Sequence, residues 1–333
     1  MACLICGLLL IVGGLIAVKL YVKLTAKRNN SYVCLVGKTA IVTGANTGKR
    51  NNSYVCLVGK TAIVTGANTG LGYFTALDFA KRGARVILAC RNKERAEQAL
   101  KKIIAATGNE NVVYKLVDFA SLESVRNFAK NINESEARLD ILVNNAGIGL
   151  QNEDFTSDGI QTILEVNHVS GFLLTHLLID KLKKSAPSRI VMVSSIMANY
   201  ASLNLKTLDD LNTLAASSKY FGILEGTGVT INATHPGAAY TDIMNNAGEV
   251  KRFIFNSIAS VMYQTAEEGA QTQIYAAVAN EVAHMNGEYF GNCTRIEMYE
   301  PAKDPELAKK VWGKSEELSK LENSEKIPDV YLQ

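Results

Sequence analysis

The chain has 333 residues, of which 47% are hydrophobic and 20% are charged, and its formal net charge at pH 7 is +3. This length suits one large or two ordinary domains, and the apolar fraction is ample for a buried core, so the composition excludes a disordered chain. The small net charge and the lack of a basic stripe with interleaved aromatic residues argue against nucleic acid as a partner. We therefore expect small molecules or lipids as partners.

The N-terminal segment from Cys3 to Val18 is uncharged and apolar. Together with residues 20–22 it can nearly cross ~30 Å of hydrocarbon as a helix. The nearest positive charges all follow the apolar run: Lys19, Lys23, Lys27 and Arg28. A cleaved signal would carry such charges before the run, and the positive-inside rule places the body of the protein in the cytosol. Residues 1–26 are therefore predicted to be a membrane anchor.

A perfect duplication follows the anchor. Residues 27–48 recur letter for letter as residues 49–70, a repeat of 22 residues. Solenoids need at least three units, so two identical copies indicate a recent tandem duplication or an error in assembling the gene. Only the second copy runs directly into a helix, at Leu71, and one sheet has one position for this strand. We expect residues 27–58 to form a tether whose strand-prone run 39–43 could pair wrongly.

Several short patterns carry little weight. The six cysteines are scattered and suggest no disulfide framework. Cys3 and Cys6 have the spacing of a zinc or redox pair, but the apolar segment offers no second pair of ligands, so packing or lipidation is favoured and no metal site is predicted. Asn-x-Ser/Thr sequons would matter only if the body faced a lumen, and they begin at Asn29, Asn51, Asn133, Asn232 and Asn292.

From residue 59 onward, strand-like and helix-like segments alternate, which predicts a doubly wound α/β domain with a parallel, seven-stranded, Rossmann-like sheet covered on both faces. The predicted strands are residues 61–65, 85–89, 112–117, 141–144, 189–193, 230–235 and 288–291. The predicted helices are residues 71–81, 93–106, 122–131, 159–184, 266–280 and 305–321. The last helix is amphipathic and lies in a C-terminal tail, residues 300–333, and we interpret its Trp312 as a packing residue.

A glycine-rich turn joins the first predicted strand to the first predicted helix. Such a turn lets backbone N–H groups approach a pyrophosphate, whose charge the helix N-terminus favours. The first gap in this Gly-x-x-x-Gly-x-Gly pattern is two residues longer than in the usual dinucleotide fingerprint, but its position after a strand supports the interpretation. The predicted cofactor contacts in the turn are Gly66, Asn68, Thr69, Gly70, Leu71 and Gly72.

The end of the second predicted strand indicates which nicotinamide cofactor binds. An NAD site would place an acidic residue there, on the ribose 2′-hydroxyl, whereas this chain has Arg91 after Cys90. Because a guanidinium suits a 2′-phosphate, NADP(H) is the predicted cofactor. The alternative is a surface arginine at the start of a helix.

Four motifs in this order together resemble the short-chain dehydrogenase/reductase family: residues 65–72, 144–147, 193–195 and 235–237. The resemblance runs from about Gly59 to Tyr299. Within it, residues 88–91, 166–168 and 226–230, with the anchored N-terminus, resemble membrane-bound retinol dehydrogenases. The resemblance implies hydride transfer between NADP(H) and a lipophilic alcohol or carbonyl such as a retinoid, by a protein that we expect in the endoplasmic reticulum membrane, facing the cytosol.

The resemblance also implies cofactor contacts beside the adenine, along the nucleotide crevice and at the nicotinamide. In that order, they are Asp118; Asn144, Ala146 and Gly147; and Pro236, Gly237 and Thr241. For Asp118 the alternative is a cap near a helix start. For the other positions, the alternatives are stabilisation of the sheet centre and a simple turn.

In this family a tyrosine placed four residues ahead of a lysine supplies the proton that hydride transfer requires. The lysine matters because a free tyrosine has a pKa of ~10 unless a nearby cation favours its phenolate. A serine holds the substrate oxygen and an asparagine orders a proton-relay water, positions that Ser195 and Asn167 match. Alternatively, Ser195 merely ends a strand and Asn167 is a polar residue in a buried helix.

The tyrosine and lysine pair is missing where the family places it. Tyr220 lies at a plausible distance beyond Ser195, but Leu224 stands where the lysine belongs. Only five residues separate Tyr220 from Gly226, whereas a parallel crossover needs about a dozen. We therefore expect an abnormally short crossover between strands five and six. The helix lost there commonly packs in the dimer of this family, so a homodimer is possible but weakened.

Three hypotheses follow from this gap. The chain is a working reductase or dehydrogenase that recruits Tyr220 with a cation such as Lys219, or it is a nucleotide-binding relative without proton transfer. The third hypothesis is a damaged gene or faulty gene model, with one segment doubled and another lost. The only Tyr-x-x-x-Lys in the chain, from Tyr299 to Lys303, contains Pro301 and lies past the last predicted strand, so we interpret it as accidental.

Overall fold

The structure is a computed structural model that describes residues 55–149, 154–195, 224, 226–237 and 264–327. The predicted membrane anchor, the first copy of the repeat and most of the predicted short crossover lie outside the described residues. So do two predicted site residues, Tyr220 and Thr241.

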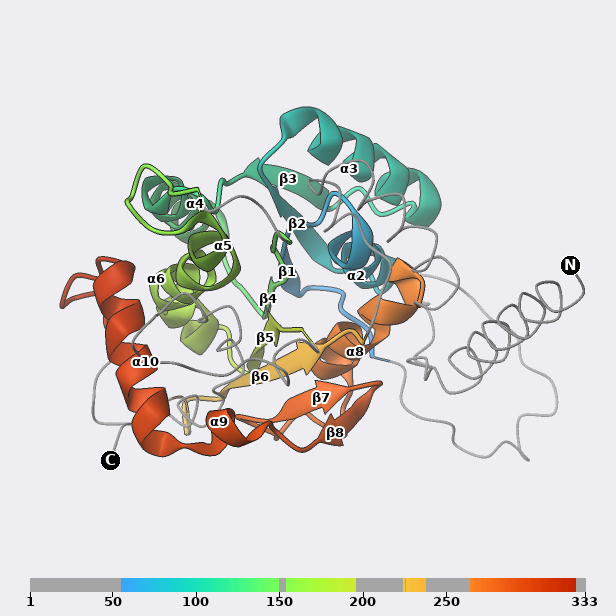
Figure 1. The fold of residues 1–333 in the computed structure, drawn as a ribbon. Helices are drawn as coiled ribbons and strands as arrows, with labels where there is room; N and C mark the ends of the chain where they lie inside the picture. The colour runs from blue at the N-terminus through green and yellow to red at the C-terminus, as the bar shows by residue number, and fades with distance from the viewer. Residues whose placement is uncertain (1–54, 150–153, 196–223, 225, 238–263, 328–333) are drawn as a thin grey trace, which may run out of the picture.

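The described residues form one sheet with helices on both faces (Figure 1). The strand order is β3-β2-β1-β4-β5-β6-β7-β8, in which β1 to β7 are parallel and β8 is antiparallel to β7. The strands are β1 Thr61–Thr65, β2 Arg85–Cys90, β3 Val112–Leu116, β4 Ile141–Asn144, β5 Ser188–Val193, β6 Val229–His235, β7 Tyr289–Gly291 and β8 Thr294–Ile296. The seven predicted strands are confirmed, and β1 comes from the second copy of the repeat.

The predicted count of seven strands is one short, because β8 closes a hairpin that sequence pattern does not reveal. The strand has three residues, too few to display an alternation of polar and apolar side chains. Its two-residue turn places Asn292 and Cys293 at φ values of 49° and 53°, a conformation for which Asn-Gly is the usual signal. A cysteine in the glycine position hides that signal.

Helices of the two faces come from different parts of the chain. On one face lie α2 Gly70–Lys81, α3 Lys93–Thr107 and α8 Ala266–Val278. On the other lie α4 Leu122–Ser135, α5 Thr162–Leu164, the π-helix η2 Glu165–Val169, α6 Ser170–Lys184 and α10 Pro305–Leu318, with α9 Glu300–Lys303 just before α10. The predicted single helix over residues 159–184 therefore begins later, at Thr162, and is interrupted by the π-helix.

The continuous helical stretch Thr162–Lys184 is the one described segment long and apolar enough to cross a membrane, with a mean hydropathy of 1.3. Of its most apolar 18 residues, 78% are buried inside the protein, where side chains of this stretch contact α4, β5 and α10. This burial identifies it as the core helix of the domain. Its apolar character thus follows from packing on two sides.

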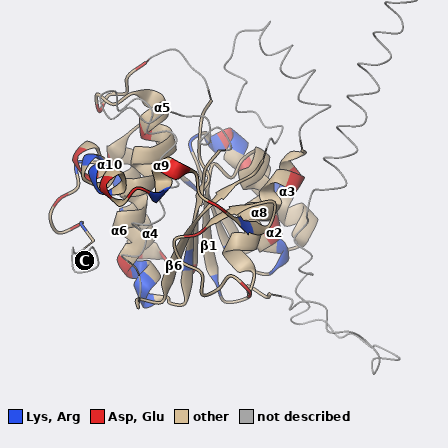
Figure 2. Ribbon diagram, turned by 60° about the horizontal axis from the view of Figure 1, so that its bottom comes forward, with Lys and Arg blue, Asp and Glu red and all other residues tan. Residues whose placement is uncertain are grey.

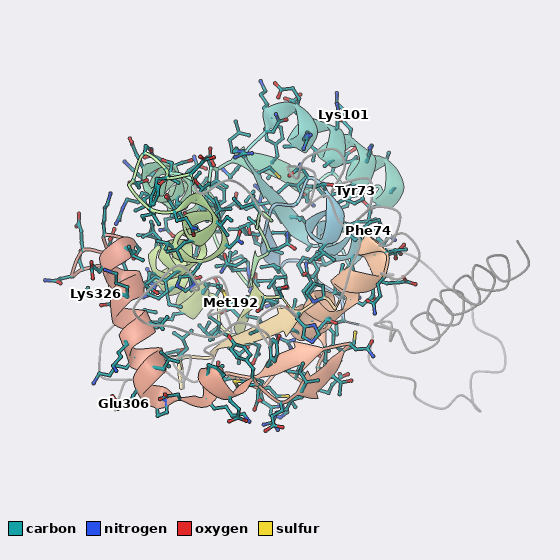
Figure 3. All side chains as sticks on the ribbon, viewed as in Figure 1. Tyr73, Phe74, Lys101, Met192, Glu306 and Lys326 are labelled. Atoms are coloured by element: carbon teal, nitrogen blue, oxygen red, sulfur yellow. The ribbon has the colours of Figure 1, made fainter. Side chains whose placement is uncertain are left out.

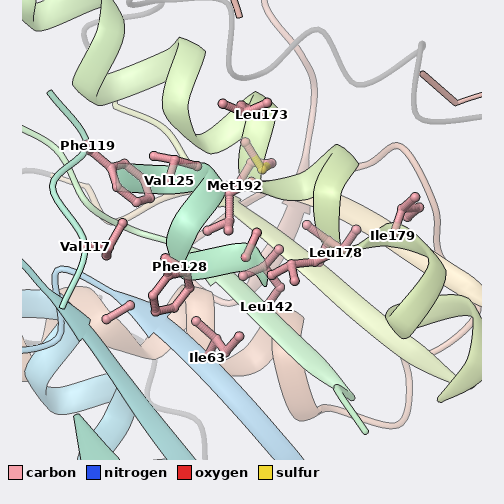
Figure 4. Close-up of a cluster of buried hydrophobic side chains, with 14 of the residues drawn as sticks. Ile63, Val117, Phe119, Val125, Phe128, Leu142, Leu173, Leu178, Ile179 and Met192 are labelled. Carbon is pink, nitrogen blue, oxygen red and sulfur yellow. The ribbon is translucent and has the colours of Figure 1, made fainter. Parts of the chain in front are cut away.

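The central strands are buried on both faces, as a doubly covered parallel sheet requires. All five residues of β1 are buried, and the same holds for the four residues of β4. Figure 4 shows one of the two resulting cores, in which Ile63, Leu142 and Met192 from the sheet meet Phe128 of α4 and Leu173 of α6. Figure 3 shows Met192 in the interior, whereas the side chains of Lys101, Glu306 and Lys326 reach the surface.

The C-terminal helix α10 packs on η2 and α6. The ring of Trp312 lies 5.0 Å from that of Phe172 and 5.2 Å from that of His176, measured between ring centres. His168 Nε2 and the Ser315 hydroxyl form a buried hydrogen bond of 2.7 Å. The packing role predicted for Trp312 is therefore confirmed. Figure 2 shows charged residues of both signs on the helices of the domain.

Candidate dinucleotide site at the carboxyl ends of the strands

The predicted site residues that the structure describes lie at one edge of the sheet, where the parallel strands end. The strand order reverses between β1 and β4, because the chain proceeds outward from β1 to β2 and in the opposite direction from β4 to β5. In open α/β sheets, ligands bind in the crevice beyond the strand ends at such a switch point. The geometry at the ends of β1 and β4 is therefore central to the site.

The turn after β1 is built from glycines whose backbone conformation or surroundings disfavour a side chain. Gly66 and Gly70 have φ values of 65° and 56°, and the Gly66 N–H donates to the Ala89 carbonyl at 2.8 Å. A Cβ atom at Gly72 would lie 2.5 Å from the Gly66 oxygen and 2.6 Å from Nδ2 of Asn145. The turn is thus closed tightly against the start of α2.

Two residues that the sequence analysis left without a role join this turn to β4. The buried Thr65 hydroxyl accepts hydrogen bonds from the N–H groups of Asn145, at 2.9 Å, and Ala146, at 2.8 Å. In return, Nδ2 of Asn145 donates to the Thr65 carbonyl at 2.8 Å. Both residues stand in motifs that point to the site, but their pairing across 80 residues of chain depends on the sheet order.

The first turn of α2 suits an anion. It contains no acidic residue, and its N-cap is Thr69, which is exposed, while Asn68 and Leu71 are half-buried. Beneath the turn, burial raises the pKa of the Cys90 thiol to about 12. Hydrogen bonds from the backbone N–H groups of Ala67 and Asn68 lower this pKa by a smaller amount. The thiol is therefore neutral at physiological pH, and it puts no negative charge beside an incoming phosphate.

Arg91 and Asp118 lie at the rim of the crevice, after β2 and β3. The guanidinium of Arg91 is 69% exposed, and its Nη1 is 4.0 Å from Oδ1 of Asp118. Asp118 Oδ1 also accepts the Ala120 N–H at 3.0 Å, whereas the N-cap of α4 is Ser121 and not Asp118. The exposed guanidinium remains accessible to a ligand in the crevice.

The residues after β4 are held by the π-helix. Oδ1 of Asn167 accepts the Ile148 N–H at 2.8 Å, and Nδ2 of Asn167 donates to the Ile148 carbonyl at 3.0 Å. A Cβ at Gly147 would approach Oδ1 of Asn167 to 3.4 Å. At the end of β4, Nδ2 of the buried Asn144 donates to the Thr175 hydroxyl at 3.0 Å. Asn167 is thus oriented by the loop that lines the crevice, a position typical of π-helical turns at functional sites.

Ser195, Pro236 and Gly237 lie at the ends of β5 and β6. Ser195 is exposed and directly follows Ser194, whose N–H donates to the Thr234 carbonyl at 2.6 Å. Gly237 has a φ of 72°, and its N–H donates to Nδ1 of His235 at 3.0 Å. The neighbouring strands therefore bring the predicted serine and the predicted nicotinamide border to the same edge.

The tyrosines that the structure describes do not resemble an acid–base residue of the family. All five have a raised pKa, through burial at Tyr73, Tyr275, Tyr289 and Tyr299 and through the hydrogen bond to Glu97 at Tyr114. At Tyr289 burial raises the pKa to about 12. Lys303, four residues after Tyr299, pairs instead with Glu297 at 2.5 Å and Glu300 at 2.7 Å. At each described tyrosine, burial or a carboxylate thus sets the direction of the pKa shift.

Comparisons with known proteins agree with this geometry. The family model described as short chain dehydrogenase matches residues 60–207. Human retinol dehydrogenase 13 is 40% identical and aligns over 94% of this chain and 93% of its own length. Mouse retinol dehydrogenase 14 is 39% identical, over 84% and 85% of the two chains. A solved short chain dehydrogenase from Burkholderia cenocepacia in complex with NADP is 28% identical, with a TM-score of 0.57 and coverage of 71% of this chain and 96% of that one.

Proposed function

Because the chain belongs to the short-chain dehydrogenase family, we propose that it is an NADP(H)-dependent oxidoreductase that interconverts a lipophilic alcohol and its carbonyl. The observation that carries the proposal is the glycine turn after β1. The Gly66 oxygen and the Asn145 amide leave no space for a side chain at Gly72, and Gly66 and Gly70 have positive φ values. A pyrophosphate is the cofactor group that such a turn accommodates.

The described residues fit the rest of an NADP molecule by their chemistry. The exposed guanidinium of Arg91 is available to a 2′-phosphate, and Asp118 beside it is available to the adenosine part. Asn144, Ala146 and Gly147 border the crevice from β4, and Pro236 and Gly237 border it from β6. The relative from Burkholderia cenocepacia was solved in complex with NADP, which supports NADP as the cofactor of this chain.

A nicotinamide cofactor supplies the hydride in this chemistry, and the protein must orient the substrate and move a proton. We assign Ser195, which is exposed at the end of β5, to the substrate oxygen. Asn167 holds the loop at Ile148 and is assigned to the proton relay. Tyr220, with Lys219 as the neighbouring cation, is our candidate for the proton donor. This last assignment rests on the sequence.

The lipophilic substrate class is inferred from the relatives. Retinol dehydrogenases 13 and 14 are named for a lipophilic alcohol, and they align with most of this chain. We therefore propose a retinol-like alcohol and its aldehyde as the substrate pair.

A second function is favoured by the absence of a Tyr-x-x-x-Lys pair where the family requires it. In that case the chain binds NADP(H) but transfers no proton, as expected of a catalytically impaired relative. The raised pKa of every described tyrosine supports this alternative, because none of these tyrosines could replace the missing one.

One experiment separates the two functions. The full chain in detergent is titrated with NADPH by fluorescence and then supplied with all-trans-retinal, while NADPH oxidation is followed. An enzyme turns retinal over, and Tyr220→Phe abolishes turnover while leaving NADPH binding intact. A binding protein takes up NADPH without turnover. If NADPH does not bind at all, both functions are excluded.

The choice of cofactor has its own test at Arg91. Removing the guanidinium in Arg91→Ala takes away a charge-assisted contact worth roughly 1.5–3 kcal/mol, which corresponds to about a 10- to 150-fold weaker affinity for NADPH. The affinity for NADH, which lacks the 2′-phosphate, should stay unchanged. Equal weakening for both cofactors would contradict the role proposed for Arg91.

We further propose that residues 1–26 anchor the protein in the endoplasmic reticulum membrane and that residues 27–58 tether the dehydrogenase domain of residues 59–299 on the cytosolic side. A sequon tests the orientation, since Asn292 lies exposed in the β7–β8 hairpin, whereas Asn232 is 2% exposed in β6. With microsomes present, the natural chain should acquire no glycan at Asn292. Replacing residues 1–26 by a cleavable secretory signal should allow one, and a glycan on the natural chain would refute the cytosolic orientation.

A further inference from the structure

A buried glutamine on α8 contacts the back of the nucleotide turn. Gln273 is 1% exposed, and its Nε2 donates to the Thr75 hydroxyl at 2.6 Å and to Oδ1 of Asn145 at 3.2 Å. Thr75 belongs to α2 and Asn145 follows β4, so three segments far apart in the sequence meet at this amide. Buried polar side chains in such a place need a reason, because an apolar residue would pack there without a desolvation cost.

The orientation of the Gln273 amide is dictated by its two partners. The Thr75 hydroxyl donates to the Leu71 carbonyl at 2.8 Å, so toward Gln273 it can only accept. Nδ2 of Asn145 donates to the Thr65 carbonyl, which turns Oδ1 of Asn145 toward Gln273. Both N–H groups of Gln273 are therefore used, and its Oε1 is buried without a hydrogen-bond partner among the described residues. An unsatisfied buried acceptor costs about 1–3 kcal/mol.

Both partners of Gln273 act on the turn itself. Nδ2 of Asn145 lies 2.6 Å from the Cβ position of Gly72 and 3.3 Å from that of Gly66, so the Asn145 amide occupies the space that those glycines leave. The Leu71 carbonyl that Thr75 engages is in the first turn of α2. Gln273 thus holds Asn145 on one side of the turn and Thr75 on the other at a fixed separation. Its own Oε1 has no hydrogen-bond partner among the described residues.

We infer that Gln273 is a positioning residue that sets the spacing of the backbone N–H groups in residues 66–72 for the pyrophosphate of the dinucleotide. The inference rests on the proposed function as far as the ligand is concerned. It extends the site to α8, which begins more than a hundred residues after β4 and packs against α2. The hydrogen bonds of Gln273 restrain residues 66–72 in the protein without the cofactor as well.

The test compares Gln273→Leu and Gln273→Met with a control, Gln271→Leu. Leucine and methionine remove both donated hydrogen bonds and also the unpaired oxygen, so the melting temperature should change little. Gln271 lies on the same helix and donates to the Glu267 carbonyl, away from the turn, so its substitution keeps the Gln273 contacts. The full chain in detergent is used for all variants.

Two readouts are measured. NADPH affinity, followed by fluorescence, should fall at least tenfold in both Gln273 variants and remain at the wild-type value in Gln271→Leu. Hydrogen exchange of the amides in residues 66–72, measured without cofactor, should become at least tenfold faster in the Gln273 variants only.

Wild-type NADPH affinity and unchanged exchange in the Gln273 variants would overturn the inference. Loss of the folded state in both Gln273→Leu and Gln273→Met would also overturn it, because Gln273 would then serve stability alone. If the wild-type chain itself fails to bind NADPH, the proposed function is lost, and hydrogen exchange alone decides whether Gln273 positions the turn.

Discussion

At the scale of single residues, two glycines in helices contrast sharply in what surrounds them. Gly72 in α2 has no space for a Cβ atom, since that atom would lie 2.5 Å from the Gly66 oxygen. Gly313 in α10 has nothing within 4 Å of the same position. Neither has a positive φ, so the difference between them is steric and not conformational. The Gly72 position keeps the turn in contact with α2.

Gly72→Ala should therefore damage the nucleotide site. The added methyl group forces the Gly66 carbonyl or the Asn145 amide to move, a displacement that typically costs 1–3 kcal/mol. We expect NADPH affinity to fall at least tenfold and the melting temperature to drop. Gly313→Ala, the control, should raise stability by roughly 0.5–1 kcal/mol, because alanine is favoured in a helix. Unimpaired NADPH binding in Gly72→Ala would show that the turn yields to a methyl group.

At the scale of elements, the π-helix η2 contains a buried carboxyl group close to the residues that line the crevice. Glu165 is fully buried, accepts a hydrogen bond from the Thr156 hydroxyl, and faces Asp158, which is paired with Lys320. Burial raises the pKa of Glu165 to about 7, and Asp158 acts in the same direction, whereas the Thr156 hydroxyl and Lys320 act against it. Two residues further along η2, Asn167 holds the loop at Ile148.

The raised pKa predicts the pH dependence of stability. Between the ordinary pKa of 4.5 and the folded value of about 7, the folded state binds more protons than the unfolded state, so the unfolding free energy falls as pH rises. At about 1.4 kcal/mol per pKa unit, the loss by pH 8 is on the order of 3 kcal/mol. The buried His168, His176 and His235 act in the opposite direction below pH 6.5, because burial lowers their pKa values. The contribution of Glu165 is therefore a difference between two chains: in denaturant titrations from pH 5 to 8, the slope of the unfolding free energy against pH should be more negative in the wild type than in Glu165→Gln. Glu134→Gln, at an exposed position of α4, should keep the wild-type slope, and an unchanged slope in Glu165→Gln would refute the assignment.

At the scale of the whole molecule, sequence periodicity was sufficient for the seven parallel strands and insufficient for β8 and for the contacts behind the site. The seven parallel strands could be predicted because each is a short apolar run between turn residues. The interruption of the core helix at Glu165 could not, because a π-turn leaves no mark on apolar spacing. Thr65, Asn145 and Gln273 escaped assignment for another reason: hydrogen bonds between distant segments depend on which strands and helices become neighbours. The places of Arg91 and the glycines in the candidate site could be predicted, because they directly follow β2 and β1 in the sequence.

The duplication provides a test on the same scale. Deleting residues 27–48 or residues 49–70 yields the same sequence, in which one copy of the repeat continues into Leu71. Because β1 and its turn require a single copy, the shortened chain should keep the melting temperature and the NADPH affinity of the full chain. It should also aggregate less, since one strand-prone run has been removed. A loss of NADPH binding would show that the first copy takes part in the domain.

The docking of α10 on η2 and α6 also bears on how the protein is made. Val311 and Ile327, near the end of the chain, belong to the same core as Ile63 and Leu142. During synthesis on the ribosome, that core cannot close before Ile327 has been added, and Phe172 and His176 stay without a partner on α10 until Trp312 has been added. Translation that stops before Pro305 would therefore release a chain with an uncovered apolar helix face, a substrate for chaperones and proteases.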